Sequence, residues 1–356
     1  MKKYGIRLIE SYYEWRKSIA GFVLRIPNYV SNCVKTKVLA RPGTCSYKGG
    51  IFNPGALEID GRIVLLAKGQ NLQWWKSRGK HKQQYLTGGA VLFSLEKDSL
   101  KKLECTRVEQ LEGFPSNDDW RLGDIRLFQW QGLNMANHSI TFIKKTEQGI
   151  DQDSTRSALS VYDHSKRVIK YLGVPEVDIE LNKFEKNWVY FSKDDRLFLL
   201  YSLNPYRLLE LDDESGYKFS TIVNEQFRNI LENPGGLGTY VSLSANPVDY
   251  DDDHWFMLVH QINHKFTGRC YYHWGVWINK TTLLPSFITS RRIFSGFGAR
   301  GRTPGIRYIS SLLKRGSEML FFAGEGDVFT TVTTLTIQHL DQLKESLVIE
   351  SKCKYT

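Results

Sequence analysis

The sequence predicts an all-β protein, a five-bladed β-propeller with an N-terminal helical extension. From about residue 50 onward, short runs rich in β-branched and aromatic residues recur, separated by turn signals such as Ile59-Asp60-Gly61 and Arg315-Gly316-Ser317. Helical periodicity is nearly absent after residue 50, apart from short segments near 225–232 and 338–343. Four-stranded antiparallel units of roughly 40–60 residues form one blade, so the chain has room for about five blades. A two-sheet sandwich is the alternative.

The predicted strands follow one another with only turns between them. The first follows the Asp-Gly turn at 60–61, and Lys193-Asp194-Asp195 separates two later runs in the same way. Each run has the length of a strand and is too short for a typical helix. The predicted strands are residues 62–67, 90–94, 124–130, 138–143, 158–162, 188–191, 197–203, 240–244, 255–261, 272–278, 306–313, 319–323 and 328–335.

The first 38 residues combine basic charge with a helical apolar stripe. They hold eight Lys and Arg against two Glu, in a chain of 356 residues whose formal net charge is +10. Apolar residues from Leu8 to Ile26 recur at spacings of three or four, which predicts a helix that either docks on the body or lies on an anionic membrane surface. The sequence therefore indicates an extension at 1–44, a propeller at 45–340 and a tail at 341–356.

Other sequence features indicate the cellular location of the protein and limit the possible metal and disulfide chemistry. Charged residues stand where a signal peptide needs an apolar core, and no apolar run of transmembrane length occurs, which predicts a cytoplasmic protein. The five cysteines lack CxxC spacing and argue against a disulfide framework and against a structural zinc site. The acidic run 249–253 lacks the glycine and the ligand pattern of an EF-hand. No metal and no cofactor is predicted.

A second basic concentration, residues 74–82, begins with two tryptophans. It fits a solvated loop, a phosphate site or a nucleic-acid patch. Nucleic acid is disfavoured, because no recognised motif accompanies the charge and the acidic run 249–253 would interrupt a basic face.

The segment Leu122-Gly123-Asp124-Ile125-Arg126-Leu127-Phe128 places an acid and an arginine in an otherwise apolar strand. Strand alternation puts Asp124 and Arg126 on the same face. Burying such charges costs desolvation energy, so the pair is either a structural salt bridge or part of an active site.

Several short motifs occur in one order along roughly residues 45–335. This order resembles the five-bladed propellers of glycoside hydrolase family 130, the β-mannoside phosphorylases. It equally resembles their relatives in glycosyltransferase family 108, which build β-1,2-mannosides from GDP-mannose. The motifs are FNPGA at 52–56, LLAK at 65–68, GDIRLF at 123–128, EKNW at 185–188, GGLG at 235–238, LVH at 258–260, SGFG at 295–298 and FAGEGD at 322–327.

The departures from the family pattern bear on the reaction. The family motif Glu-Asp-Pro-Arg, whose Asp is the general acid or base, reads Gly-Asp-Ile-Arg here. The phosphorylases carry an arginine where this chain has Lys68, and a phosphate-binding His-Arg-Arg cluster where it reads Leu200-Tyr201-Ser202-Leu203. Because guanidinium groups hold phosphate through two parallel hydrogen bonds, these losses disfavour phosphorolysis. The cations that would replace them from neighbouring blades are Lys186, Arg207 and Arg300.

The predicted site combines these motifs. Asp124 is the predicted catalytic base, which takes a proton from the acceptor hydroxyl. The basic residues predicted to face the leaving diphosphate are Lys68, Arg126, Lys186, Arg300 and Arg302. The residues predicted to contact sugar are Asn53, Asn187 and His260. Tyr201, Trp188 and Trp130 are predicted either to stack on sugar rings or to pack between blades. The candidates for a second carboxylate, which hydrolysis would need, are Glu185, Glu325 and Asp327.

The resemblance implies an inverting β-mannosyltransferase that moves mannose from GDP-mannose to a mannoside or a lipid-linked O-antigen or capsule acceptor. The basic amphipathic start suggests peripheral contact with the inner face of the cytoplasmic membrane. The alternative function is a β-mannoside phosphorylase or hydrolase acting on soluble manno-oligosaccharides. A third possibility, a non-catalytic sugar-binding propeller, stays open because the Glu and Pro around Asp124 are lost.

Overall fold

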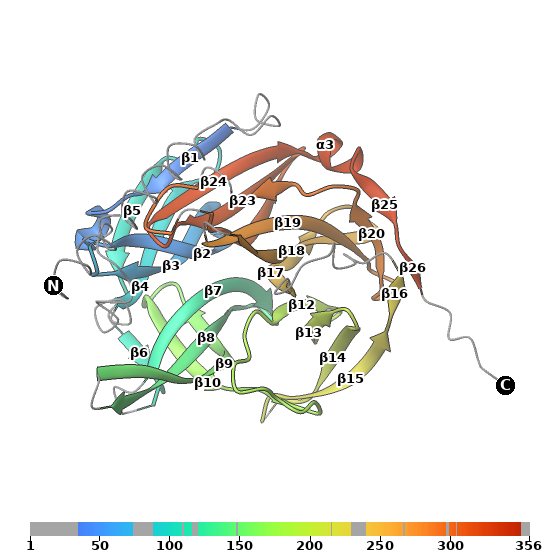
Figure 1. Ribbon diagram of the computed structural model, residues 1–356, viewed down its shortest axis with the longest axis horizontal. Helices are drawn as coiled ribbons and strands as arrows, with labels where there is room; N and C mark the ends of the chain where they lie inside the picture. The colour runs from blue at the N-terminus through green and yellow to red at the C-terminus, as the bar shows by residue number, and fades with distance from the viewer. Residues whose placement is uncertain are drawn as a thin grey trace, which may run out of the picture.

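The protein is a five-bladed β-propeller, as predicted, with sheets arranged around a central axis (Figure 1). The innermost strands of neighbouring blades contact one another around that axis. The computed structural model describes residues 35–73, 88–108, 110–115, 120–146, 149–214, 216–228, 240–265, 268–296, 299–303 and 305–349.

The first three blades follow the chain from the innermost strand outward. Blade 1 consists of β2 (Gly50–Ile59), β3 (Arg62–Gln70), β4 (Gly88–Glu96) and β5 (Lys102–Arg107). Blade 2 consists of β7 (Trp120–Trp130), β8 (Leu133–Thr146), β9 (Gly149–Asp163) and β10 (Val168–Gly173), with β6 (Gln110–Glu112) at its outer edge. Blade 3 consists of β12 (Val189–Lys193), β13 (Arg196–Leu203), β14 (Tyr206–Asp213) and β15 (Lys218–Glu225), with β11 (Glu176–Val177) at its outer edge.

The last two blades recruit strands from both ends of the described chain. Blade 4 consists of β17 (Tyr240–Asp249), β18 (His254–Lys265), β19 (Gly268–Asn279), β20 (Pro285–Thr289) and β25 (Lys344–Ser346), and β21 (Phe294–Ser295) also pairs with β19. Blade 5 consists of β22 (Arg307–Arg315), β23 (Glu318–Glu325), β24 (Phe329–Thr336) and β1 (Lys35–Ala40). The remaining elements are η2 (Thr44–Ser46), α3 (Ile337–Asp341) and the pair β16 (Phe227–Arg228) with β26 (Val348–Ile349).

Strand β1 closes the ring, because it pairs antiparallel with β24 and so completes the last blade with the start of the described chain. The propeller sheets thus extend beyond the predicted 45–340 range, to β1 on one side and to β25 on the other. Pairing of these segments covers sheet edges that would otherwise expose unpaired backbone groups. The predicted N-terminal amphipathic helix falls mostly on residues 1–34, which lie outside the described residues.

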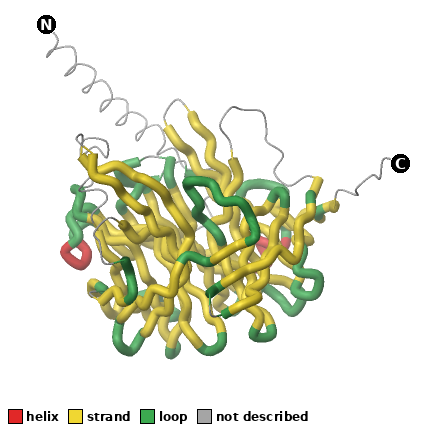
Figure 2. Tube along the Cα trace, turned by 90° about the horizontal axis from the view of Figure 1, so that it is seen from below, coloured by secondary structure: helices red, strands yellow, loops and turns green. Residues whose placement is uncertain are grey.

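The apolar core is divided among the interfaces between blades. One cluster joins blades 1 and 5 through residues such as Leu65 and Phe322, and four similar clusters fill the other interfaces. Both faces of a middle strand therefore meet a neighbouring blade. This is why β3 is buried continuously from Ile63 to Ala67 and shows no apolar–polar alternation. Figure 2 shows the strands running side by side, with short turns along one edge of the molecule.

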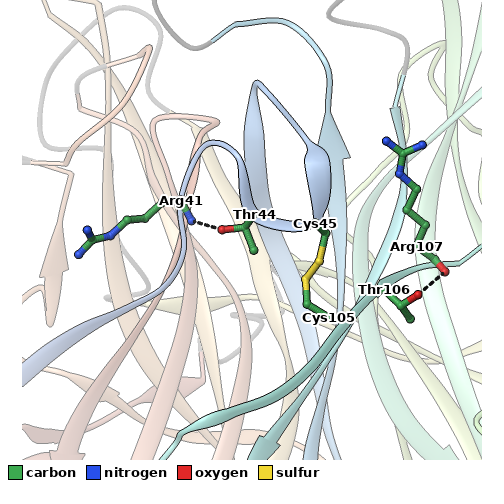
Figure 3. The surroundings of a disulfide bond; sticks show 6 residues. All are labelled: Arg41, Thr44, Cys45, Cys105, Thr106 and Arg107. Atoms are coloured by element: carbon green, nitrogen blue, oxygen red, sulfur yellow. Dashed lines mark hydrogen bonds between the residues drawn. A yellow bond between two sulfur atoms is a disulfide. The ribbon is translucent and has the colours of Figure 1, made fainter.

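Each predicted strand overlaps an observed one, but two other expectations are wrong. The segment near 225–232 contains no helix in its described part, because β15 continues to Glu225 and β16 follows at Phe227–Arg228. The cysteine prediction fails at one pair: Cys45 of η2 and Cys105 of β5 form a disulfide with Cα atoms 6.0 Å apart (Figure 3). Spacing alone could not show this pair, because 60 residues of blade 1 separate the two cysteines and the fold brings them together.

The segment near 338–343 matches the observed helix α3. Its N-cap Thr336 accepts a hydrogen bond from the His339 backbone N–H at 3.2 Å. Among the described residues, the structure contains no helix whose length and hydropathy would let it cross a bilayer.

Candidate active site

Three polar residues with left-handed backbone conformation lie within or just before three innermost strands. Asn53 in β2, Asp124 in β7 and Asn187 just before β12 have φ angles of 53°, 48° and 68°. The pairing register shifts between Phe52 and Gly55 and again between Gly123 and Arg126, which marks a β-bulge in each of the first two strands. Asn and Asp tolerate this backbone region better than other residues with a side chain, and bulges commonly re-aim side chains near active sites.

The bulge in β7 separates Asp124 from Arg126, which strand alternation places on one face. Asp124 lines a cavity and keeps about one fifth of its side chain exposed (20%), whereas Arg126 is 2% exposed. Gly55 permits the close packing behind them, because a Cβ atom there would lie 2.9 Å from the Arg126 Cα. The two charged groups therefore have different surroundings and form no structural salt bridge with each other.

Arg126 connects the innermost strands of four blades. Its Nε donates to the Ser244 carbonyl at 2.5 Å, and its Nη2 donates to Asn187 Oδ1 at 3.0 Å and to the Tyr308 hydroxyl. The Tyr308 hydroxyl donates to Asn187 Oδ1 at 3.0 Å. Arg126 Nη1 also donates to the Asp124 backbone carbonyl at 3.3 Å, so it supports the backbone that carries the carboxylate.

A cavity of about 420 Å³ lies at the end of the propeller axis where Asn53, Asp124 and Asn187 meet. Its size lies within the range of small-molecule sites. Its wall contains four cationic side chains and two carboxylates. The lining residues are Phe52, Asn53, Lys68, Arg121, Leu122, Gly123, Asp124, Ser139, Thr141, Gln152, Thr155, Phe184, Lys186, Asn187, His260, Ile262, Arg269, Tyr271, Ile306, Tyr308 and Asp327.

Asp124 is held in its ionised form. Burial raises the pKa of its carboxyl group, but the charges of Lys186 and Arg126 oppose that effect. Asn53 Nδ2 donates to Asp124 Oδ1 at 2.8 Å, and Lys186 Nζ lies 4.0 Å from Oδ2. With a further contribution from Lys68, these groups lower the pKa of Asp124 below its ordinary value.

Lys68 approaches the cavity beside Gly123. A Cβ atom on Gly123 would lie 3.0 Å from the Ser139 hydroxyl and 4.0 Å from Lys68 Nζ. The missing side chain at 123 therefore leaves room beside the Lys68 ammonium group. Lys68 and Lys186 are the predicted cations that line the cavity.

His260 belongs to an aromatic wall on the opposite blades. Its ring stacks on Tyr271 with centroids 5.2 Å apart and meets Tyr308 edge-on at 5.3 Å. Burial, followed by the charges of His273 and Lys186, lowers the pKa of His260 well below its ordinary value. The ring is therefore neutral at physiological pH and acts there as an aromatic and hydrogen-bonding surface.

Several predicted site residues lie outside the cavity wall. Glu325 is fully buried between Arg300 (3.4 Å) and Arg307 (3.0 Å). The Tyr201 hydroxyl donates to Glu185 at 3.0 Å, and that carboxylate also caps the backbone N–H of Asn182. These side chains, like Arg126, stabilise the surroundings of the site. The predicted residues that line the cavity are Asn53, Lys68, Asp124, Lys186, Asn187, His260 and Asp327.

Sequence reasoning missed part of the wall. Arg121 precedes the recognised motif by two residues on the same strand, and Arg269 follows a hairpin turn whose register is visible only in the pairing of β18 with β19. Tyr308 stands between ordinary strand residues, and only its hydrogen bonds to Arg126 and Asn187 distinguish it. A count of charges two residues before each motif would have found Arg121.

The remaining sequence predictions concern the basic segment 74–82, Arg302 and metal binding, and none of these adds a residue to the described cavity wall. The basic segment 74–82 lies outside the described residues, and Arg302 donates to Gln70 and to the Leu72 carbonyl, each at 2.7 Å. Within the described ranges, no cluster of three or more His, Cys, Asp or Glu has the arrangement of a metal site.

At the level of sequence, no protein-family model and no curated protein matches the chain. Its fold, however, is shared with solved structures. The β-1,2-mannobiose phosphorylase of Listeria innocua is 14% identical with a TM-score of 0.57, over 89% of this chain and 95% of that one. A second similar structure comes from the GH130 family of mannoside phosphorylases, which contains hydrolases that target β-1,2-mannosidic linkages in Candida mannan. It is 13% identical with a TM-score of 0.56, over 87% of this chain and 92% of that one.

The chain has the fold of the GH130 mannoside phosphorylases. MPT-1, a GDP-Man-dependent mannosyltransferase from Leishmania mexicana, is also similar, at 10% identity and a TM-score of 0.57, over 81% of this chain and 85% of that one. At these identities the likeness to the GH130 fold establishes the architecture alone. The reaction has to be argued from the cavity itself.

Proposed function

We propose that the protein is an inverting β-mannosyltransferase that moves mannose from GDP-mannose to a hydroxyl of a mannoside acceptor. In the proposed step the acceptor oxygen attacks the anomeric carbon, GDP leaves from the opposite face, and Asp124 takes the acceptor proton. The likeness to mannoside phosphorylases and to a GDP-Man-dependent mannosyltransferase supports mannose as the sugar.

The ionised state of Asp124 carries the proposal. Synthesis of a glycosidic bond needs a base for the acceptor hydroxyl, and a carboxylate with a lowered pKa is available as a base at neutral pH. Hydrolysis and phosphorolysis instead need a protonated acid for the leaving oxygen, which is favoured by a raised pKa. Asn53 and Lys186 hold Asp124 in the form that synthesis requires.

The charges of the cavity wall fit a diphosphate leaving group. Lys68, Arg121, Lys186 and Arg269 line the cavity, against Asp124 and Asp327. Cations placed where negative charge develops stabilise a departing phosphate group. Hydrolysis is less well supported, because Glu185 and Glu325 are engaged away from the cavity and leave Asp327 as the second carboxylate of the described wall.

A phosphorylase is the second candidate, because the same four cations would also attract inorganic phosphate. The two functions separate in one set of assays. GDP-mannose with β-mannobiose is expected to release GDP and form a longer mannoside, whereas β-mannobiose with phosphate is expected to stay intact. Mannose 1-phosphate formed only when phosphate is added would replace the transferase proposal with the phosphorylase.

The pH profile of kcat/KM is expected to reflect the low pKa of Asp124. Since the base form exists above that pKa, activity should not fall through Asp124 protonation between neutral pH and pH of about 5. In Lys186→Met the pKa rises, because a neighbouring positive charge is lost, and the acid limb should move to higher pH.

Lys166→Met is the matched control for this profile, because Lys166 is a surface lysine that pairs with Asp163 on the outer part of blade 2. Its profile should match that of the wild type. A wild-type profile that instead loses activity as pH rises from 5 toward neutrality would show that Asp124 acts as an acid.

We also propose that the acceptor is lipid-linked and that the protein works at the cytoplasmic face of a membrane. This proposal rests on the basic amphipathic pattern of residues 1–38, of which the structure describes 35–38. Removal of residues 1–30 is expected to reduce binding to anionic liposomes and turnover of a lipid-linked acceptor, with turnover of a soluble mannoside unchanged. Equal liposome binding by the two forms would contradict it.

A further inference from the structure

Phe184 is an aromatic side chain exposed at the cavity, and the mechanism above does not use it. Its side chain is 54% exposed, the largest value among the four large apolar residues that are exposed in the described part of the chain. The other three are Leu103, Leu133 and Ile222, none of which lines the cavity. Exposing an apolar ring to water has an unfavourable solvation free energy. A ligand that covers the ring would remove that cost.

The backbone that presents Phe184 is anchored on both sides. The flanking residues bond to β9: the Thr155 N–H donates to the Lys183 carbonyl at 3.2 Å, and the Glu185 N–H donates to the Thr155 carbonyl at 2.9 Å. Arg156 Nη1 donates to the Lys183 carbonyl at 2.8 Å. The backbone that carries Phe184 is therefore held by hydrogen bonds on both sides.

The segment that presents Phe184 also carries the cation that faces the proposed base. Lys186 follows Phe184 by two residues, which span at most about 7 Å of extended chain. Its ammonium group lies 4.0 Å from Asp124 Oδ2. The segment that carries Phe184 therefore reaches Asp124 through Lys186, and Phe184 and Asp124 line the same cavity.

The surroundings of Phe184 provide hydrogen-bonding groups at its edge. Thr141, Gln152 and Thr155 line the neighbouring part of the wall, with Gln152 Nε2 donating to Thr155 Oγ1 at 2.6 Å. An apolar platform with a polar fringe is the arrangement that suits a pyranose, which has an apolar ring face and hydroxyl groups around its perimeter.

We propose that Phe184 is the stacking platform for the acceptor sugar and selects β-mannosides over α-mannosides; this deepens the proposed function and rests on it. In a β-mannopyranoside the axial hydrogens of C1, C3 and C5 share one ring face, which is flat and apolar. In the α anomer the axial oxygen on C1 occupies that same face and holds the ring away from an aromatic plane. The half-exposed position of Phe184 leaves the rest of an oligosaccharide acceptor in solvent.

Phe184→Ala is expected to weaken binding of β-mannobiose to the full-length protein about tenfold, measured by isothermal titration calorimetry without donor. Phe184→Tyr, which keeps the ring, should bind within about twofold of the wild type, and Phe184→Leu should bind like Phe184→Ala because a branched apolar chain offers no flat face. Leu133→Ala is the matched control, since Leu133 is an exposed apolar residue outside the cavity (45% exposed). Methyl α-mannoside should bind weakly, and equally to wild type and Phe184→Ala.

The same variants separate this inference from the proposed function. In turnover assays Phe184→Ala should raise the KM for the acceptor about tenfold and leave the KM for GDP-mannose unchanged. A raised KM for GDP-mannose alone would mean that the ring stacks on the donor base and would overturn the inference with the transferase intact. A different result is that Phe184→Ala loses β-mannobiose binding while the wild type never uses GDP-mannose. That result would support the stacking role of Phe184 and overturn the transferase proposal. Absence of mannoside binding by the wild type would overturn both.

Discussion

Asp124→Asn is expected to lower kcat for mannosyl transfer by a factor of about 10² to 10⁴, the range that a positioned general base contributes. The substitution removes the negative charge and preserves the shape of the side chain. Asn also tolerates the left-handed backbone of this position (φ 48°), and its carbonyl oxygen can still accept the hydrogen bond from Asn53. Initial-rate measurements of GDP release over a range of acceptor concentrations would give the effect on kcat.

The loss should be chemical and not structural. Binding of β-mannobiose and the thermal unfolding midpoint of Asp124→Asn should stay close to those of the wild type. A variant that keeps more than about one tenth of the wild-type kcat would remove Asp124 from the role of base. Unchanged sugar binding in a protein that never shows turnover would favour the non-catalytic sugar-binding propeller.

Among the variants considered for this protein, Arg126→Met is expected to lose the most stability, about 3 kcal/mol in the free energy of unfolding. Arg126 is 2% exposed and donates to groups on three other blades, so its removal takes the close donor from the Ser244 carbonyl and leaves Asn187 Oδ1 with the Tyr308 hydroxyl as its remaining donor. Each buried polar group that loses its partner costs about 1–3 kcal/mol. Urea unfolding followed by tryptophan fluorescence would measure the change.

Arg196→Met is the matched control for Arg126, because Arg196 is about half exposed and pairs with Glu210 on the surface of blade 3. Loss of an exposed ion pair should change the free energy of unfolding by at most about 1 kcal/mol. Similar unfolding curves for both variants would contradict the structural role of Arg126. If Arg126→Met lost activity but kept its stability, the role of Arg126 would be to contact the leaving diphosphate, as the sequence predicted.

The strands of this propeller were predictable because they are short, apolar and separated by turns. Every predicted run overlaps an observed strand, and the motif order placed Asn53, Asp124 and Asn187 at one cavity. Strands with polar or interrupted sequences were missed: β2 contains Asn53-Pro54-Gly55, and β14 carries Glu210 between its leucines. Their pairing depends on neighbours in the blade that local sequence does not reveal.

The site was less predictable than the fold, because bulges determine where its side chains point. Alternation alone gives Asp124 and Arg126 the same surroundings, and the register shift between Gly123 and Arg126 separates them. Glu325 likewise sits in a recognised motif but is buried between two arginines. Arg121 reaches the cavity from the same strand as Asp124, and Arg269 reaches it from β19 of blade 4, whose position depends on the closed ring.

One competition experiment tests the central claim, that this cavity builds mannosidic bonds with Asp124 as a base. GDP-mannose, β-mannobiose and inorganic phosphate would be combined with the wild type or with Asp124→Asn, and the anomeric signals followed by proton NMR. The proposal predicts a new β-mannosyl signal that grows with GDP, needs β-mannobiose and is absent in Asp124→Asn. Mannose 1-phosphate and free mannose forming from β-mannobiose, with GDP-mannose unconsumed, would contradict it.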